Sequence, residues 1–454
     1  MLAAAALCFC ACGSKPSFDK AHIVASFGVM SDSHIDSPDN ATAQKLHSAL
    51  EQLRDKAAEQ DADGLDGVLM AGDLINNAYA NPANYVQVDY WKSIYESVFD
   101  PSEVSMVYTP GNHDTFREWT PSTILQAQNL SERFGVNYFL TDKDMQAKKD
   151  LECRHCVVAG VHILCILPVD RNPVCYTPEQ KAWLDARLAE ITKADPDRYV
   201  LILTHPMIFN TVYGSRLGDY WDTADLTDIL SKYPQAVVFG GHLHFPLNDP
   251  RSIWQGEFTA MGCGSVRYMA IEDGGYEDMS SKTVMRDANE FSQGLLVQID
   301  RKGNMRITRM DFYHKSPIGE PWIISHPAKN GSHLNTYSHT TRKAGNKAPV
   351  LGEFEVNVET PTTAGTPVSV TFAAGKDDEF VHDYIITVSQ ADGTPMYRKK
   401  ILADFYVAPQ ASQMKTSWTR PIGTFNPGAY KVTLLARDSW GAQSETLERE
   451  FTIE

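Results

Sequence analysis

The chain has 454 residues, with 57 Asp and Glu against 41 Lys and Arg, and a formal net charge of −16. This length predicts two or three domains and allows a large core. The acidic balance disfavours sequence-independent binding of nucleic acids, which needs basic patches that neutralise phosphates, so we expect no nucleic-acid-binding surface.

Residues 1–19 are predicted to be a lipoprotein signal segment and tether. The run Leu2–Ala11 is apolar and too short to span a bilayer. It leads into Phe9-Cys10-Ala11-Cys12-Gly13-Ser14, which resembles a bacterial lipobox. The resemblance implies a lipidated Cys12 that tethers the mature chain to the membrane, in the bacterial cell envelope, facing the periplasm or the outer surface. No Lys or Arg precedes the apolar run, so we expect the true start to lie upstream. A buried N-terminal helix in a cytosolic protein is the alternative.

Strand and helix patterns alternate along residues 20–312, which are predicted to form the first domain. The alternation indicates a mostly parallel, layered sheet. The expected strands are Ile23–Met30, Val68–Met70, Val104–Tyr108, Tyr199–Leu203 and Ala236–Phe239. The expected helices are Ala41–Gln60, Val86–Phe99, one that begins at the capping box Thr177–Gln180, and Thr223–Lys232. A hairpin over residues 295–299 and 305–310 is expected to close the second sheet.

The rest of the chain has a different character. Residues 313–345 lack periodicity and are predicted to be a linker whose histidines lie on the surface: His314, His326, His333 and His339. Residues 346–454 alternate apolar and polar residues between turn clusters, which predicts an antiparallel β-sandwich. The stretch from Pro427 to Gly441 is similar to the closing strands of immunoglobulin-like or fibronectin-III-like domains of surface proteins. We therefore expect this all-β domain to contact cell-surface components.

A Cys-x-x-Cys motif, Cys153-Arg154-His155-Cys156, has no partner motif at zinc-finger spacing. It precedes Val157 rather than a thioredoxin-like helix. We interpret it as a surface hairpin with inert or paired thiols, and not as a redox centre.

Chemistry-bearing residues follow the expected strands. The motifs are Asp32-Ser33-His34, Gly72-Asp73, Gly111-Asn112-His113-Asp114, Thr204-His205 and Gly241-His242-Leu243-His244. Residues just past strand ends can converge on one rim of an α/β sheet, which is where such sheets bind ligands. Asp, Asn and His at these points are typical of metal ligands.

The ordered series of motifs resembles the calcineurin-like metallophosphoesterase superfamily over roughly residues 22–312. The resemblance implies an α/β fold with two sheets packed face to face and helices outside. The expected architecture is thus a four-layer α-β-β-α sandwich metallophosphoesterase domain followed by an all-β sandwich domain.

The resemblance also implies a ligand set for two metal ions. Asp32, His34 and His244 would bind the first ion, and Asn112, His205 and His242 the second. Asp73 would bridge the two, because a carboxylate can place one oxygen on each ion. The ions would be manganese, iron or zinc, since these ligands suit all three.

Two further residues are assigned catalytic roles by the same resemblance. His113 would lie beside the scissile phosphate and protonate the leaving oxygen or stabilise charge, and Asp114 would orient a neighbouring group. The chain departs from a common form of the family after Gly72-Asp73, where many members have another acid and this chain has Leu74-Ile75-Asn76-Asn77. Four residues near the motifs could line the pocket but are interpreted as structural: Tyr213, Arg216, Trp221 and Arg267.

The predicted function is hydrolysis of a small-molecule or lipid phosphate mono- or diester by a metal-bridging hydroxide, with His113 assisting the leaving group. One alternative is a cell-surface binding protein with a vestigial metal domain, which the filled ligand positions disfavour. Another keeps the enzyme but makes the substrate a nucleotide pyrophosphate or a phospholipid head group. The motifs do not choose among these substrates.

Overall fold

The structure is a computed structural model of the chain. It describes residues 17–61, 63–77, 82–115, 130, 132–134, 145–148, 153–168, 170–171, 174–215, 224–359 and 365–454. Residues 1–16 of the predicted signal segment, which include Cys12, and the residues Arg216 and Trp221 lie outside these ranges. Among the described helices, none combines the length and the hydropathy needed to cross a membrane.

The first sheet has the order β15-β14-β13-β1-β2-β3, and β16 also pairs with β14. Its centre is parallel, because β1 pairs with β2 and β2 with β3 in the same direction. The antiparallel hairpin β13–β14 lies on the other side of β1. The strands are β1 (Ile23–Met30), β2 (Gly67–Ala71), β3 (Ser105–Thr109), β13 (Gln293–Asp300), β14 (Met305–Asp311), β15 (Ser316–Pro317) and β16 (Trp322–Ile324).

The second sheet has the order β11-β12-β10-β9-β6-β5-β4. The run β6, β9, β10 and β12 is parallel, and antiparallel strands flank it. The strands are β4 (Met145–Lys148), β5 (Cys153–Val158), β6 (Val161–Ile166), β9 (Val200–Thr204), β10 (Ala236–Gly240), β11 (Ile253–Gln255) and β12 (Thr259–Gly262). A separate two-stranded ribbon joins β7 (Asp170–Arg171) and β8 (Val174–Cys175).

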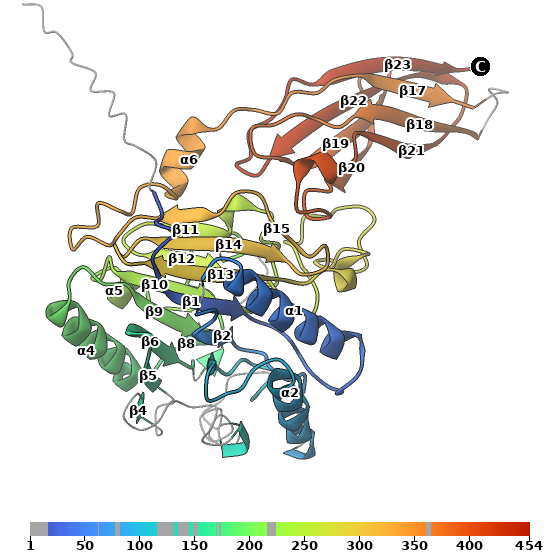
Figure 1. Cartoon of the computed structure of the whole chain (residues 1–454). Helices are drawn as coiled ribbons and strands as arrows, with labels where there is room; N and C mark the ends of the chain where they lie inside the picture. The colour runs from blue at the N-terminus through green and yellow to red at the C-terminus, as the bar shows by residue number, and fades with distance from the viewer. Residues whose placement is uncertain are drawn as a thin grey trace, which may run out of the picture.

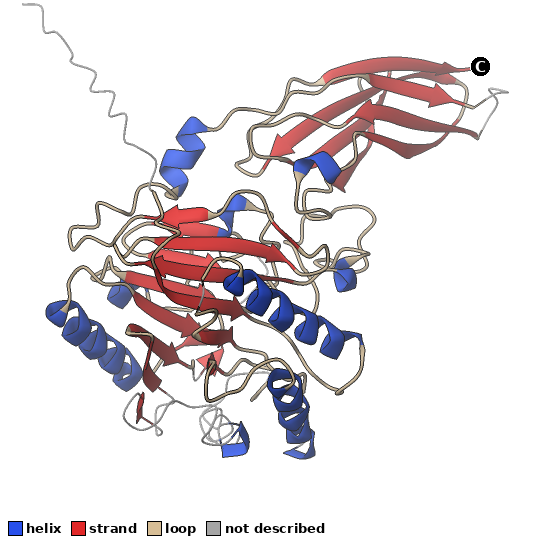
Figure 2. Ribbon diagram, in the orientation of Figure 1, coloured by secondary structure: helices blue, strands red, loops and turns tan. Residues whose placement is uncertain are grey.

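The two sheets pack face to face, and helices cover their outer faces (Figures 1 and 2). Phe27 and Leu295 of the first sheet share one buried cluster with Leu201 and Phe239 of the second. The outer face of the first sheet carries α1 (Ala41–Ala58) and α2 (Val86–Glu96), and that of the second carries α4 (Pro178–Ala194) and α5 (Thr227–Leu230). The predicted four-layer α-β-β-α architecture is confirmed.

Helix boundaries follow local chemistry. The Asn40 side chain accepts the Ala43 amide and begins α1. Thr177 and Gln180 form the predicted capping box of α4. Short 3₁₀ turns occur at η2 (Pro82–Tyr85), η5 (Pro250–Ser252), η6 (Ala288–Glu290) and η7 (Ala411–Gln413).

The C-terminal region is a β-sandwich, as predicted. One sheet has the order β17-β18-β21 and the other β20-β19-β22-β23, with antiparallel neighbours throughout. The strands are β17 (Phe354–Val358), β18 (Thr366–Ala373), β19 (Val381–Gln390), β20 (Pro395–Leu402), β21 (Ser417–Phe425), β22 (Gly428–Asp438) and β23 (Leu447–Ile453). Helix α6 (His339–Gly345) precedes this region, which is drawn in orange and red in Figure 1.

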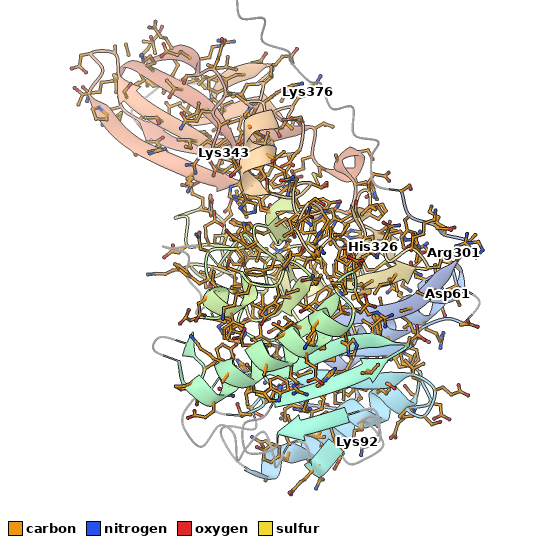
Figure 3. All side chains as sticks on the ribbon, turned by 90° about the vertical axis from the view of Figure 1, so that its left-hand side faces the viewer. Asp61, Lys92, Arg301, His326, Lys343 and Lys376 are labelled. Atoms are coloured by element: carbon orange, nitrogen blue, oxygen red, sulfur yellow. The ribbon has the colours of Figure 1, made fainter. Side chains whose placement is uncertain are left out.

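Residues 313–345 are more ordered than the predicted linker. Strands β15 and β16 pair with β14 and extend the first sheet past residue 312. They are too short to show a period of two in the sequence. The prediction of surface histidines holds for His326, which is exposed (Figure 3). It is wrong for His333, which is 8% exposed and contacts the Pro234 carbonyl through Nε2 at 2.9 Å.

Two local predictions are corrected. The expected helix over residues 223–232 is reduced to α5, because Ala224 pairs instead as an extended residue with Met207 and Phe209. The Cys-x-x-Cys motif lies in β5, which forms the predicted hairpin with β6, but both cysteines are buried and not at the surface. Cys153 packs toward α4 and Cys156 between the two sheets, so the two thiols point to opposite faces and cannot pair with each other.

The sandwich packs against the first domain through an interface with both polar and apolar contacts. The Tyr213 hydroxyl lies 3.0 Å from Nε2 of His382 on β19. The Glu277 amide donates to the Lys400 carbonyl at 2.8 Å, and Arg251 donates to the Ser439 carbonyl. Tyr213 and Tyr276 are buried there and belong to one apolar cluster that also contains sandwich residues.

A chain that ends near residue 345 is expected to hydrolyse a small chromogenic ester at a similar rate, because every predicted metal ligand precedes residue 245. The interface predicts a melting temperature lower by ~5 °C or more, since Tyr213 and Tyr276 become exposed. Calorimetry and a rate assay on the same fragment check both parts. A folded, metal-loaded fragment without activity would show that the sandwich helps to form the site.

Candidate metal centre

The predicted ligands meet where the carboxyl ends of strands from both sheets come together. Asp32 and His34 follow β1, Asp73 follows β2, and Asn112 follows β3. From the second sheet, His205 directly follows β9, and His242 and His244 follow β10. All of them are buried: Asp32, His34, Asp73, Asn112, His205, His242 and His244. The predicted residues therefore converge at one rim of the two sheets, as expected from the sequence.

The backbone at this rim is held in an uncommon conformation. Five of the predicted ligands have positive φ angles: Asp32 (56°), His34 (45°), Asp73 (52°), His242 (67°) and His244 (57°). Residues other than glycine adopt this region rarely, and such residues cluster at functional sites. These angles place five strand-end residues in the left-handed region at the rim.

Glycines in the motifs make room for the ligands. A Cβ on Gly72 would lie 2.3 Å from Nδ1 of His205, and one on Gly111 would lie 2.1 Å from Oδ1 of Asp73. A Cβ on Gly241 would lie 1.8 Å from the hydroxyl of Ser31 and 2.7 Å from Oδ2 of Asp32. Each glycine thus allows the neighbouring strand end to approach a ligand.

One group of ligand atoms gathers Asp32, His34 and His244, with all atoms within 4.8 Å of one another. Oδ1 of Asp32 lies 3.0 Å from Nε2 of His244 and 3.7 Å from Nε2 of His34. The two imidazole nitrogens are 3.4 Å apart. This is the set assigned to the first metal ion.

A second group gathers Asp32, Asp73 and His205 within the same limit. Nε2 of His205 lies 3.3 Å from Oδ2 of Asp73 and 3.1 Å from Oδ1 of Asn112. The ring of His242 packs edge-on against that of His205, with centroids 5.1 Å apart. Oδ2 of Asp73 also lies 3.7 Å from Nε2 of His34, so this carboxylate stands between the two groups.

Backbone carbonyls fix the orientation of the imidazoles. Nδ1 of His205 lies 2.7 Å from the Ala71 carbonyl, and Nδ1 of His244 lies 3.0 Å from the Tyr268 carbonyl. A carbonyl only accepts hydrogen bonds, so in both rings Nδ1 carries the proton and Nε2 faces the carboxylates. Metal-binding histidines are held by this kind of contact. The donor set therefore fits metal ions.

A family model described as calcineurin-like phosphoesterase matches residues 25–246. Residues 25–246 form a calcineurin-like phosphoesterase domain.

Solved structures show similarity to parts of the chain. A dimetal phosphatase from Danio rerio is 13% identical, and the match covers 67% of this chain and 99% of that chain with a TM-score of 0.43. The PKD domain of an M14-like peptidase from a Thermoplasmatales archaeon is 21% identical, and the match covers 24% of this chain and 97% of that chain with a TM-score of 0.16. No curated protein matches the sequence significantly.

The electrostatics of the phosphoesterase domain suit a cation at the rim. Burial opposes ionisation of Asp32 and Asp73, but the neighbouring histidines hold the pKa of both carboxyl groups below the usual value. Burial lowers the pKa of His34 to about 4 and that of His242 to about 3, which keeps these rings neutral. Burial also acts to lower the pKa of His205, but the charge of Asp73 outweighs it and raises the pKa to about 9. The ionised carboxylates of Asp32 and Asp73 therefore attract a cation at this rim.

His113 lies beside the first group of ligands. Its ring packs edge-on against that of His34, with centroids 4.4 Å apart, and its backbone amide donates to Oδ1 of Asp73 at 2.8 Å. Nδ1 lies 2.5 Å from the Asn76 carbonyl. The backbone carbonyl of Asn76 therefore orients the His113 ring.

Asp114 has a positioning role in the structure. Its Oδ1 accepts the Ile75 amide at 2.8 Å, and its Oδ2 accepts the Gly111 amide at 2.7 Å. The side chain is fully buried, and burial together with the charge of Asp73 raises its pKa to about 7. The Asp114 carboxylate thus connects the loop after β2 with the loop after β3. Both of these hydrogen bonds go to backbone amides of residues that are not predicted ligands.

Sequence reasoning missed Tyr268, while Arg267 and Tyr213 were both interpreted as structural. The Tyr268 ring packs on that of His244 with centroids 4.2 Å apart. The Arg267 amide donates to the Asp32 carbonyl at 3.1 Å. Both residues follow β12, whose end lies on the same rim as that of β10, and this position was the only signal in the sequence. Tyr213 packs instead on Phe245 and on the sandwich residue His382.

Replacing Gly111 by Ala is expected to displace the Asp73 carboxylate, because the added Cβ would overlap its Oδ1. We expect loss of bound metal and a fall in turnover of ~10-fold or more, measured by elemental analysis and a rate assay. Gly345→Ala is the matched control, since nothing lies within 4 Å of a Cβ there. A Gly111→Ala variant with full metal content and normal turnover would contradict the close-approach account.

Proposed function

We propose that this protein is a metal-dependent hydrolase of phosphate mono- or diesters, with its active site at the rim formed by β1, β2, β3, β9 and β10. The observation that supports this most is the position of Asp73. Its carboxylate lies between His205 and His34, which belong to the two adjacent groups of buried ligand atoms. A carboxylate that serves two adjacent groups is what a two-metal site requires.

The proposed site holds two ions of manganese, iron or zinc, bound by the seven predicted ligands. When bound, such ions supply a nucleophilic water near neutral pH and neutralise phosphoryl oxygens. The protein contributes the arrangement of its ligands, which the positive φ angles and the motif glycines keep fixed.

His113 serves the leaving group in this proposal. The Asn76 carbonyl fixes a proton on Nδ1, so Nε2 is the nitrogen that can transfer a proton to the leaving oxygen. The ring contact with His34 and the hydrogen bond from its backbone amide to Asp73 hold His113 next to the predicted ligands.

An activity panel tests the proposed function. The purified chain would be loaded separately with manganese, iron or zinc and assayed on nitrophenyl phosphate, bis(nitrophenyl) phosphate, a cyclic nucleotide, a nucleotide diphosphate and a glycerophosphodiester. We expect turnover of at least one ester, lost on chelation and restored by the metal. A fully loaded chain that hydrolyses none of them would refute the proposal.

We further propose that Cys12 carries lipid and that the mature chain lies outside the cytoplasm. The lipobox-like sequence around Cys12 supports this. Mass spectrometry of the N-terminal peptide from the native host would show an acylated cysteine. An unprocessed, unacylated Met1 would contradict it.

A further inference from the structure

Arg267 is held against the metal centre by its backbone. Its amide donates to the Asp32 carbonyl at 3.1 Å, and the carbonyl of the next residue, Tyr268, receives Nδ1 of His244. The Arg267 carbonyl accepts Nζ of Lys45 at 2.7 Å, which fixes it from the side of α1. The guanidinium therefore extends from a segment whose position is set by two predicted metal ligands.

The guanidinium of Arg267 has no acidic partner in the part of the chain that the structure describes. Nη1 donates to the amide oxygen of Asn76 at 2.5 Å, and no described carboxylate forms an ion pair with Arg267. The nearby carboxylate of Asp36 accepts instead from the side-chain amides of Asn40 and Asn76. Lys45 adds a second positive charge nearby, and burial, with the charge of Arg267 next in size, lowers its pKa to about 8.

A half-buried cation without a carboxylate is suited to an anion that arrives from outside. A guanidinium has five N–H donors in a planar fork that matches phosphate oxygens, and one bond to Asn76 leaves most of them available. Asn76 also carries the carbonyl that orients His113. A single residue thus joins Arg267 to the group that serves the leaving oxygen.

We propose that Arg267 binds a phosphoryl oxygen of the substrate, and that the neutral side chain of Asn76 holds the guanidinium in place without neutralising it. The inference rests on the proposed function and adds a substrate-binding residue to it. An acid at position 76 would accept the same hydrogen bond but would pair with Arg267 and reduce its attraction for an anion.

Binding of inorganic phosphate to the metal-loaded protein, measured by calorimetry, tests the role of Arg267. We expect Arg267→Ala to weaken phosphate binding by ~10- to 100-fold, and Arg267→Lys, which keeps the charge but not the fork, to weaken it less. Asn76→Asp should also weaken binding by ~10-fold, since it supplies a carboxylate to the guanidinium. Asn77→Asp is the matched control, because it adds the same charge one residue away, where Oδ1 faces Gln87. It should change binding by less than ~3-fold.

The inference would be overturned if Arg267→Ala bound phosphate as tightly as the wild type and if Asn76→Asp and Asn77→Asp had equal phosphate affinities. If Arg267→Ala loses metal or unfolds, Asn76→Asp decides, because it retains the arginine. Phosphate binding needs no turnover, so a wild-type protein that binds phosphate through Arg267 but hydrolyses nothing would refute the proposed function alone. KM values separate two sources of the anion. If Arg267→Ala raises the KM for nitrophenyl phosphate, Arg267 binds the phosphoryl group that is transferred. If it raises the KM only for a nucleoside diphosphate, Arg267 binds the second phosphoryl group of that substrate.

Discussion

Replacing Asp73 by Asn is expected to reduce turnover by ~10³-fold or more and to lower the metal content of the protein. Asp73 stands between the two groups of ligands, 3.3 Å from His205 and 3.7 Å from His34. A neutral amide cannot place an anionic oxygen on each of two cations. Asn is the substitution of choice, because Asp73 has a φ of 52° and Asn tolerates this left-handed conformation well.

The metal content and the rate should be measured on the same sample of Asp73→Asn. Asp63→Asn is the control, since Asp63 is exposed and its substitution removes the same charge at a position away from the rim. Asn112→Ala provides a graded comparison, because its amide oxygen lies 3.1 Å from Nε2 of His205 and its loss should weaken chiefly the second metal ion. Two retained ions and full turnover in Asp73→Asn would show that the bridging role is wrongly assigned.

Replacing His113 by Ala is expected to lower turnover of an alkyl phosphate ester by ~10²–10⁴-fold. An alkoxide is a poor leaving group and needs the proton that Nε2 of His113 can provide. A nitrophenyl ester should lose much less, because its leaving group departs as a stable anion. The ratio of the two losses therefore measures proton transfer and separates it from a general disturbance of the site.

The metal content of His113→Ala distinguishes two readings of the geometry. Ligand atoms of His113, His34 and Asp73 lie within 4.8 Å of one another, so the ring is close enough to be a ligand itself. We expect the metal content to stay unchanged. Loss of one ion would show that His113 belongs to the ligand set, and equal losses on both esters would show that it stabilises charge on the phosphoryl group.

The convergence of the proposed ligands could be predicted from the sequence because each follows an apolar run that encodes a buried strand. Strand ends converge by topology, so Asp32 and His205 meet although 173 positions separate them in the sequence. The glycines were part of the same signal, since Gly72 and Gly111 leave room for His205 and Asp73. Local patterns were sufficient to predict the positions of these residues because each of them is placed by the strand that directly precedes it.

Other features depend on pairing partners that a local pattern does not show. Strands β15 and β16 form because β14 offers a free edge to short segments that follow it. The contact between Arg267 and Asn76 joins segments 191 residues apart, after β12 and after β2. The interface between Tyr213 and His382 likewise requires the sandwich to be placed on the first domain.

The central claim is that the rim binds two metal ions that make the protein a phosphoesterase. Titration of the metal-free chain with manganese, with bound ions and hydrolysis of bis(nitrophenyl) phosphate measured at each point, tests it most directly. We expect activity to appear as the chain approaches two bound ions and to disappear when they are removed. Saturation at a single ion with full activity, or two bound ions with no hydrolysis of any phosphate ester, would contradict the claim.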